Sequence, residues 1–276
     1  MVNVEQAVER LGLTIERRLD GGVFGATLVR SPGAARAVLK LLPDRVAPSL
    51  DAVAEAAALA GGLRGAGYPI PAVLDLGLVD GTVFTLQEYV AGEVPDRITE
   101  PVAARLVELW DLHREAAPDT DDAWAVRLVD EIRAGVELRP QLSDPRAVAV
   151  LDRAVAIGRS ADPDGFRTGD VVHGDFHTGN VLVDDHGRLA AVIDWEGTRI
   201  GDARFDLVRL WTGGASVDAY DPAASVLIKE CAEASVPTEV WRVCGARIAL
   251  DHLRFATFVD PESLPWVLRE AALLLR

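Results

Sequence analysis

The chain has 276 residues, of which 49% are apolar, so it can bury a substantial core and is not intrinsically disordered. Its net charge of −15 argues against a nucleic-acid-binding protein, for which a basic stripe is expected, and is compatible with a cationic small molecule. The chain has no run of eighteen apolar residues, and residues 1–6 lack the features of a signal peptide, so we expect no membrane partner and a cytoplasmic location.

Two strands are expected near the N-terminus, at residues 13–18 and 26–30, with a glycine-rich turn between them at 20–25. Gly22 and Gly25 would let backbone N–H groups approach the phosphates of a nucleotide. The full G-x-G-x-x-G pattern is missing, so an ordinary hairpin turn is the alternative interpretation.

A third strand is expected at residues 35–42 and contains Lys40. Lys40 and Lys229 are the only lysines in the chain, so arginine fills almost all basic surface positions. A lysine near the end of an apolar strand can bind the α- and β-phosphates of a nucleotide as a compact point charge. We therefore predict that Lys40 contacts nucleotide phosphates.

The next expected element is a helix at residues 49–63, with Ser49 as its N-cap and an alanine-rich body. A phosphate-binding lysine needs a carboxylate that holds it in place. Glu55 is the expected partner of Lys40, and Asp51, one turn earlier, is the competing acid. A solvated helix face is the alternative role for Glu55.

Two further strands are expected at residues 73–78 and 83–89, and the second runs into a Gly/Pro break at 90–95. A strand that ends in such a break is a suitable hinge between two domains. The backbone at the end of this strand would meet the edge of an adenine ring. The residues predicted to make this contact are Gln87, Glu88 and Tyr89.

The most informative segment spans residues 171–196, where two short apolar runs flank a turn. The runs 181–183 and 189–193, separated by Asp-Asp-His-Gly, predict an antiparallel hairpin. In such a pair the start of the first strand lies beside the end of the second, which would bring Asn180 close to Asp194. One amide oxygen and one carboxylate suffice for Mg²⁺, which completes its shell with water and phosphate oxygens.

Asp175 lies five residues before Asn180, which is the D-x-x-x-x-N spacing of kinase catalytic loops. A carboxylate in this position would accept the proton of an attacking hydroxyl. Asp and Asn are also common in Asx turns, so each residue alone has an ordinary structural explanation. Their combination with H-G-D before and I-D-W after favours phosphoryl transfer.

These motifs together resemble the aminoglycoside phosphotransferase and choline kinase family, which has a protein-kinase-like fold. The likeness covers nearly the whole chain and begins at the glycine-rich turn. It continues through the loop H-G-D-F-H-T-G-N at 173–180 and I-D-W-E at 193–196 to G-D-A-R-F-D-L at 201–207.

The resemblance implies roles for the residues named above. Asp175 would be the catalytic base or would orient the acceptor hydroxyl, and Asn180 and Asp194 would bind the magnesium ions. Lys40 and Glu55 would form the ion pair that positions the phosphates.

By the same resemblance, His177 would stand near the transferred phosphate, and His173 and Asp206 would brace the catalytic loop. Phe176 and Thr178 depart from the family's usual loop, which is closer to H-G-D-L-H-P-G-N, but neither position donates a ligand. Only a short stretch separates the metal-binding Asp from the next helix, which leaves little room for the docking of a peptide substrate.

The expected architecture is α+β, a bilobal protein-kinase-like fold with a small antiparallel-sheet N-lobe and a mostly helical C-lobe. The N-lobe, residues 1–91, would clamp the nucleotide, and the C-lobe, residues 92–276, would hold the acceptor pocket. Cys231 and Cys244 fall in expected helices and would be reduced. Helices of the C-lobe are expected at residues 102–115, 122–137, 145–160, 203–211, 223–234, 238–257 and 261–275.

The implied activity is ATP- and Mg²⁺-dependent transfer of the γ-phosphate to a hydroxyl of a small molecule, with GTP as a possible donor. An antibiotic such as an aminoglycoside is the expected acceptor, which the reaction would inactivate. A metabolic kinase for choline, a sugar or an amino-acid alcohol is one alternative, and a nucleotide-binding pseudokinase is another. We expect a monomer or a homodimer.

Overall fold

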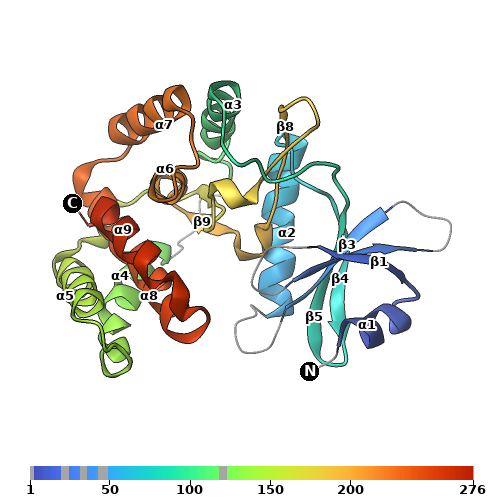
Figure 1. Ribbon diagram of the computed structural model, residues 1–276, viewed down its shortest axis with the longest axis horizontal. Coiled ribbons are helices and arrows are strands. Elements are labelled where there is room, and N and C mark those ends of the chain that lie inside the picture. Colours follow the sequence, from blue (N-terminus) through green and yellow to red (C-terminus); the bar gives the residue numbers. More distant parts are fainter. Residues whose placement is uncertain (1–2, 20–24, 32–35, 43–48, 118–122, 276) are drawn as a thin grey trace. The chain divides into compact units, whose positions relative to one another are not determined.

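The computed structural model describes residues 3–19, 25–31, 36–42, 49–117 and 123–275 (Figure 1). The chain divides into two compact units: Met1–Glu93 with Leu182–Thr198, and Val94–Val181 with Arg199–Arg276. The predicted domain boundary after residue 91 falls two residues before the end of the first of these segments. Residues 182–198, which the prediction assigned to the second domain, are grouped with the first unit.

The first unit contains a five-stranded antiparallel sheet with the strand order β1-β2-β3-β5-β4. Asp80 and Gly81 join β4 to β5, and their φ angles of 51° and 80° suit the tight turn of a two-residue hairpin. β3 pairs with β2 on one side and with β5 on the other, so Lys40 belongs to a central strand. The strands are β1 (Thr14–Leu19), β2 (Ala26–Arg30), β3 (Arg36–Leu42), β4 (Val73–Val79) and β5 (Thr82–Glu88).

Alternate residues of β3 point to opposite faces of this sheet. Leu39 is buried in a cluster that includes residues of α1 (Val4–Arg10). Leu42 is buried in a second cluster with residues of α2 (Leu50–Gly65). Because Lys40 is two residues from Leu42, its side chain lies on the face of the sheet that packs against α2.

Helix α2 begins at Ser49, whose hydroxyl accepts a hydrogen bond from the Ala52 N–H at 3.2 Å, which confirms the predicted N-cap. The buried residues of α2 recur every three or four positions, and Glu55 lies between them on the exposed side. The buried positions are Val53, Ala56, Ala60 and Leu63.

The predicted hairpin is present as β7 (Val181–Val183) and β8 (Leu189–Val192). It is followed by a short 3₁₀ turn, η4 (Trp195–Gly197). The indole of Trp195 packs edge-on against the ring of Tyr68, with 5.1 Å between the ring centroids. This contact ties the segment after the hairpin to the N-terminal part of the chain.

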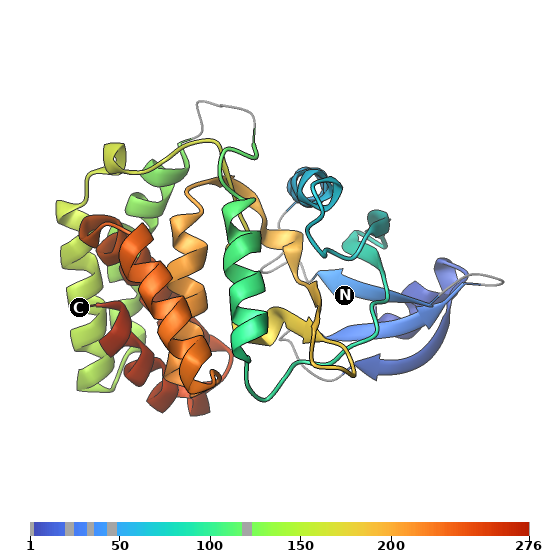
Figure 2. The same cartoon turned by 90° about the horizontal axis from the view of Figure 1, so that it is seen from above.

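The second unit is mostly helical, and α3 and α7 lie side by side within it although they are far apart in the sequence (Figure 2). All seven helices predicted for this region are present, with ends that differ by up to five residues. They are α3 (Glu100–Asp111), α4 (Trp124–Ala134), α5 (Pro145–Ser160), α6 (Arg204–Ser216), α7 (Pro222–Ser235), α8 (Thr238–Phe258) and α9 (Leu264–Leu274). Two short strands, β6 (Asp170–Val172) and β9 (Arg199–Gly201), pair antiparallel.

Helix α6 is longer than predicted because it continues through Gly213 and Gly214. Both glycines are places where another side chain approaches the helix backbone. A Cβ atom at Gly213 would lie 3.3 Å from Cβ of His177, and one at Gly214 would overlap the ring of Tyr220. The two glycines therefore serve packing, although glycine usually ends or weakens a helix.

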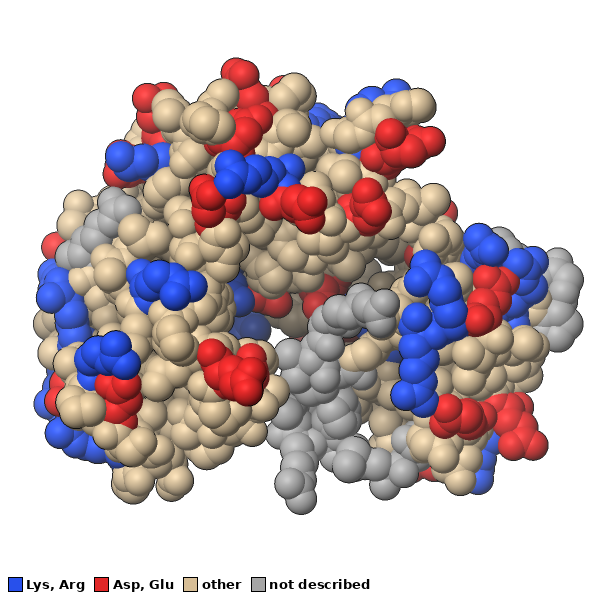
Figure 3. Space-filling model, viewed as in Figure 1, with Lys and Arg blue, Asp and Glu red and all other residues tan. Residues whose placement is uncertain are grey.

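Acidic and basic side chains are interspersed on the face of the molecule shown in Figure 3. Several surface arginines pair with acids of neighbouring elements, as Arg18 does with Glu5 and Arg30 with Glu16. Within the described residues, no helix has the length and apolar character needed to cross a bilayer.

We expect Gly214→Ala to lower the free energy of unfolding by about 1–3 kcal/mol, because the added methyl group collides with the buried ring of Tyr220. The matched control is Gly61→Ala in α2, where a Cβ atom meets nothing within 4 Å. That change should raise stability by up to about 1 kcal/mol. Urea unfolding of both variants checks this, and equal effects would contradict the proposed packing role.

Candidate active site

The predicted catalytic loop leaves β6 at His173 and is held by the first turn of α6. The carboxylate of Asp206 accepts hydrogen bonds from the backbone N–H of His173 at 2.7 Å and of Gly174 at 2.9 Å. Gly174 has a φ of 85°, a conformation that a residue with a side chain adopts only with strain. Asp206 therefore braces the loop, as expected from the sequence.

The two carboxylate oxygens of Asp175 have different surroundings. Oδ1 accepts hydrogen bonds from Nε of Arg209 at 3.1 Å and from Nη2 of the same guanidinium. Oδ2 lies 3.4 Å from Nδ2 of Asn180 and 3.4 Å from Nε2 of His177. The Asp175 side chain remains 44% exposed, so a substrate can reach it.

The same neighbours control the charge of Asp175. Burial raises the pKa of this carboxyl, but the Arg209 guanidinium and His177 outweigh burial and hold the pKa well below 3.8. Asp175 is therefore ionised at neutral pH. A carboxylate with so low a pKa is a weak proton acceptor, so its chemistry suits the alignment of a hydroxyl better than complete removal of a proton.

Asn180 ends a 3₁₀ turn, η3 (Thr178–Asn180), and its amide orientation is fixed by the loop itself. Its Nδ2 donates to the backbone carbonyl of Asp175 at 2.8 Å. Because a carbonyl oxygen can only accept, the amide nitrogen of Asn180 must face it, and Oδ1 of Asn180 is left to act as a ligand for a cation. His177 caps the same turn, because its Nδ1 accepts a hydrogen bond from the Gly179 N–H at 3.0 Å.

In the first unit, the ammonium of Lys40 lies between two carboxylates. Nζ is 2.6 Å from Oδ1 of Asp194 and 3.0 Å from Oε1 of Glu196. Burial alone would lower the pKa of Lys40, but Glu196 and Asp194 raise it above 10.5, so the side chain is fully charged. Asp194 has a left-handed backbone with a φ of 75°.

Glu196 is the more enclosed of the two partners, with a side chain only 10% exposed against 46% for Asp194. Its Oε1 also accepts hydrogen bonds from Nε2 of Gln87 at 2.9 Å and from the hydroxyl of Thr85 at 3.2 Å. Three donors thus converge on Glu196, which makes it a fixed anchor for Lys40.

This arrangement corrects the predicted pairing of Lys40 with Glu55. Glu55 is exposed on α2, and the ion pairs of Lys40 among the described residues are with Asp194 and Glu196. The physical reason is that the buried stripe of α2 faces the sheet with small apolar side chains, which turns Glu55 toward solvent.

The predicted adenine-binding residues lie at the end of β5. The side chain of Gln87 is buried and binds Glu196, and the N–H groups of Glu88 and Tyr89 donate to Ala72 at 2.8 Å and Arg36 at 3.4 Å. An adenine contact at Glu88 or Tyr89 would therefore use backbone carbonyls.

The two predicted phosphate-binding glycines have different outcomes. Gly25 precedes β2 with a φ of 70°, whereas Gly22 lies outside the described residues.

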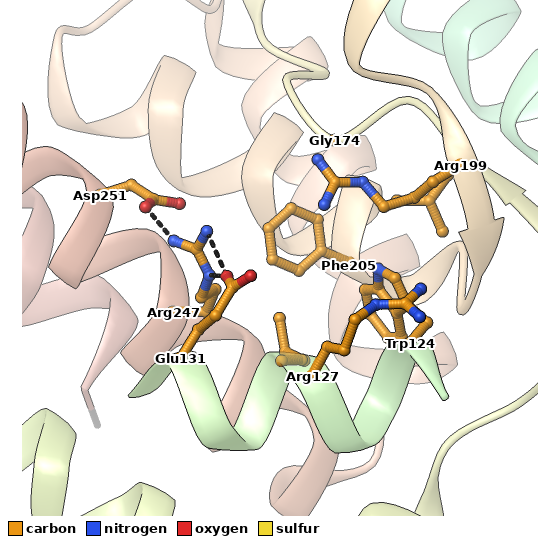
Figure 4. Close-up of a pocket in the computed structure, with 10 residues that line it drawn as sticks. Trp124, Arg127, Glu131, Gly174, Arg199, Phe205, Arg247 and Asp251 are labelled. Atoms are coloured by element: carbon orange, nitrogen blue, oxygen red, sulfur yellow. Dashed lines mark hydrogen bonds and ion pairs between the residues drawn. The ribbon is translucent and has the colours of Figure 1, made fainter. Parts of the chain in front are cut away.

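A pocket of the second unit reaches the catalytic loop at Gly174 (Figure 4). Arg127 and Glu131 of α4 lie along one side of it, and Arg199 of β9 points toward it from the opposite side. The remaining charged residues come from α8, where Arg247 pairs with Asp251 and also with Glu131 at 2.7 Å. Aromatic and apolar walls are formed by Trp124, Leu128, Val172 and Phe205.

Two functional candidates were missed in the sequence. Glu196 follows Asp194 by two positions, and Arg209 follows Asp206 by three positions in α6. The spacing in α6 was an available signal, because residues three apart share a helix face. The role of Glu196 depends on a contact across 156 residues, which no local pattern indicates.

Comparisons with known proteins agree with this architecture. The model of the phosphotransferase enzyme family matches residues 16–230. The crystal structure of aminoglycoside phosphotransferase APH(4)-Ia is similar with a TM-score of 0.70 at 19% identity, covering 98% of this chain and 96% of that one. Choline kinase LicA from Streptococcus pneumoniae is similar with a TM-score of 0.66 at 13% identity, covering 97% and 96%. A search of curated protein sequences found no match.

We expect Glu196→Gln to lower the free energy of unfolding by about 1–3 kcal/mol, because it removes a charged partner of the buried Lys40. Glu55→Gln is the matched control and should change stability by less than about 0.5 kcal/mol, since Glu55 is exposed. Urea unfolding compares the two. A larger loss in Glu55→Gln than in Glu196→Gln would restore Glu55 as the partner of Lys40.

Proposed function

The chain belongs to the phosphotransferase enzyme family, and on this premise we propose that it transfers the γ-phosphate of ATP to a hydroxyl group of a small molecule. The single observation that supports this proposal most strongly is the environment of Asp175. Its carboxylate is ionised and partly exposed, is held at Oδ1 by Arg209, and makes longer contacts of 3.4 Å at Oδ2 with Asn180 and His177. A carboxylate in this state can align an acceptor hydroxyl for attack.

The ligands bound in similar structures support ATP as the phosphate donor. APH(4)-Ia has been crystallised as a thermostable mutant in ternary complexes with ADP and hygromycin B and with AMP-PNP and hygromycin B. In this chain Lys40 supplies the compact positive charge that nucleotide phosphates require. GTP remains an alternative donor that the same residues would accept.

The proposed cofactor is Mg²⁺, which would neutralise the charge that develops on the phosphate oxygens. Asn180 and Asp194 would hold it, and both fit, because Asn180 presents a carbonyl oxygen and Asp194 a half-exposed carboxylate. No group of three or more His, Cys, Asp or Glu side chains in the described part of the chain forms a complete metal cage. Two protein ligands are nevertheless enough for Mg²⁺ when phosphates and water fill the other positions.

In the proposed reaction the acceptor hydroxyl attacks the γ-phosphorus in line with the leaving oxygen of ADP. A P–O bond to the acceptor forms and the bond between the β-bridging oxygen and the γ-phosphorus breaks. Oδ2 of Asp175 accepts a hydrogen bond from the attacking hydroxyl, whose proton passes to an oxygen of the transferred phosphoryl group and then to solvent. Lys40 offsets negative charge on the nucleotide. His177, whose Nε2 lies 3.4 Å from Oδ2 of Asp175, would donate to the transferred group.

For the acceptor we propose an antibiotic such as an aminoglycoside, which phosphorylation would inactivate. The similarity to aminoglycoside phosphotransferases supports this choice. The net charge of −15 is compatible with a polycationic acceptor.

A second candidate is a metabolic kinase for choline, a sugar or an amino-acid alcohol. The pocket at Gly174 favours the last of these, because its charged lining contains Arg127, Arg199 and Arg247 as well as two acids. A mixed lining of this kind suits an acceptor that carries both an amine and a carboxylate better than it suits a polycation.

The first test is acceptor-dependent release of ADP or GDP, with Mg-ATP and Mg-GTP, over a panel of aminoglycosides, other antibiotics, choline, sugars and amino-acid alcohols. Asp175→Asn is the control and should lower kcat by about 10²- to 10⁴-fold while nucleotide affinity is kept. Tight nucleotide binding without stimulated release by any acceptor would favour the pseudokinase alternative.

We expect Asp194→Ala to weaken the binding of Mg-ATP by about tenfold or more, because a carboxylate ligand is lost. Calorimetric titration with Mg-AMP-PNP measures the effect. An unchanged affinity would show that Asp194 is not a metal ligand.

A further inference from the structure

A buried chain of contacts leads from the proposed active site into the C-terminal helices. Arg209 of α6 binds Asp175, and its Nη1 contacts Nε2 of His252 in α8. On the other side of the imidazole, Nδ1 of His252 lies 2.6 Å from Oε2 of Glu270 in α9. These contacts connect four residues, one from the loop and one from each of three helices. The side chains become more buried with distance from Asp175, because Arg209, His252 and Glu270 are 15%, 6% and 0% exposed.

The protonation pattern along this chain follows from its donors. Arg209 can only donate, so Nε2 of His252 accepts, and a neutral ring then carries its proton on Nδ1, which lies 2.6 Å from Oε2 of Glu270. Burial and the adjacent guanidinium both lower the pKa of His252, which agrees with a neutral ring. Arg209 thus lies between Asp175 and a neutral histidine that contacts Glu270 on its other side.

This geometry determines which oxygen of Asp175 can meet a substrate. Two donors of Arg209 converge on Oδ1, whereas Oδ2 faces Asn180 and His177 at 3.4 Å. We propose that Arg209 is a positioning residue that fixes Oδ1 of Asp175 and presents Oδ2 to the acceptor hydroxyl, and that His252 and Glu270 hold Arg209 in this orientation. The proposal rests on the phosphotransferase function proposed above.

Neighbouring residues pack closely around the connected side chains of Arg209, His252 and Glu270. The ring of Trp266 lies 4.7 Å from that of His252, and Gly213 leaves room beside both Glu270 and His177. A buried carboxylate such as Glu270 is costly unless a partner compensates it, and the imidazole of His252 lies against it at 2.6 Å.

The decisive measurement is the steady-state kinetics of Arg209→Met with the best acceptor. We expect kcat to fall by about 10- to 100-fold, because a small misplacement of the aligning carboxylate is enough for such a loss. The KM values for ATP and for the acceptor should stay within about threefold, since Arg209 binds neither. Arg209→Lys should recover only part of kcat, because lysine retains the charge but not the two converging donors.

The matched control is Arg242→Met in α8, an exposed arginine paired with Glu239, which should leave kcat unchanged. For His252, glutamine can still accept from Arg209 and donate to Glu270, whereas leucine can do neither. We therefore expect His252→Gln to keep most of kcat and His252→Leu to lose it. Unchanged kcat in Arg209→Met, or a raised acceptor KM with unchanged kcat, would overturn the proposal.

A second experiment is independent of any acceptor. Urea unfolding of Arg209→Met, Asp175→Ala and the double variant gives a double-mutant cycle. Asp175→Ala leaves the buried guanidinium of Arg209 without its carboxylate. The unfolding constant of the double variant should therefore be about tenfold smaller than the product of the two single-variant effects predicts, which is equivalent to about 1.4 kcal/mol. If the effects of the two single variants simply multiply in the double variant, the coupling between Arg209 and Asp175 is refuted. Failure of every acceptor to stimulate turnover would instead refute the proposed function, while the cycle would still decide whether Arg209 and Asp175 act together.

Discussion

The second unit depends on buried aspartates that bind backbone N–H groups of distant segments. Asp206, with no exposed surface, binds the N–H groups of His173 and Gly174. Asp170 binds Glu115 and Ala203 in the same manner, and Asp202 binds Arg167. A buried carboxylate is tolerated only when donors surround it, so each of these groups favours one arrangement of the chain over all others. The loop that carries Asp175 is anchored to this framework through Asp206.

Much of this organisation was predictable from periodicity and motif spacing. The hairpin at 181–192 and the seven C-terminal helices have strong local patterns, and the D-x-x-x-x-N spacing was enough to single out Asp175 and Asn180. The partner of Lys40 was not predictable in this way. Reasoning from the nearest helix selects Glu55, although the apolar spacing in α2 already turns that residue to solvent, whereas the observed partner Glu196 is brought near by tertiary packing.

The position of Lys40 has a consequence for the electrostatics of the first unit. Its ammonium offsets the charge of Asp194 and Glu196, two carboxylates that would otherwise repel each other at close range. Glu196 is fixed by Thr85 and Gln87 and is almost enclosed, whereas Asp194 is half-exposed. The lysine can therefore stay on Glu196 when the charge near Asp194 changes.

Helix α6 supports the catalytic loop at three successive points of one face. Asp206, Arg209 and Gly213 are three and four residues apart, and they meet the backbone of Gly174, the carboxylate of Asp175 and the side chain of His177 in the order of the loop. The helix thus contacts the loop at points whose spacing is set by the helical repeat. Deleting a single residue after Asp206 would rotate the later two supports by about 100° away from their targets. The interior of α6 therefore cannot gain or lose a residue between these supports without breaking their alignment with the loop, whereas the segments that connect the helices are not bound by this spacing.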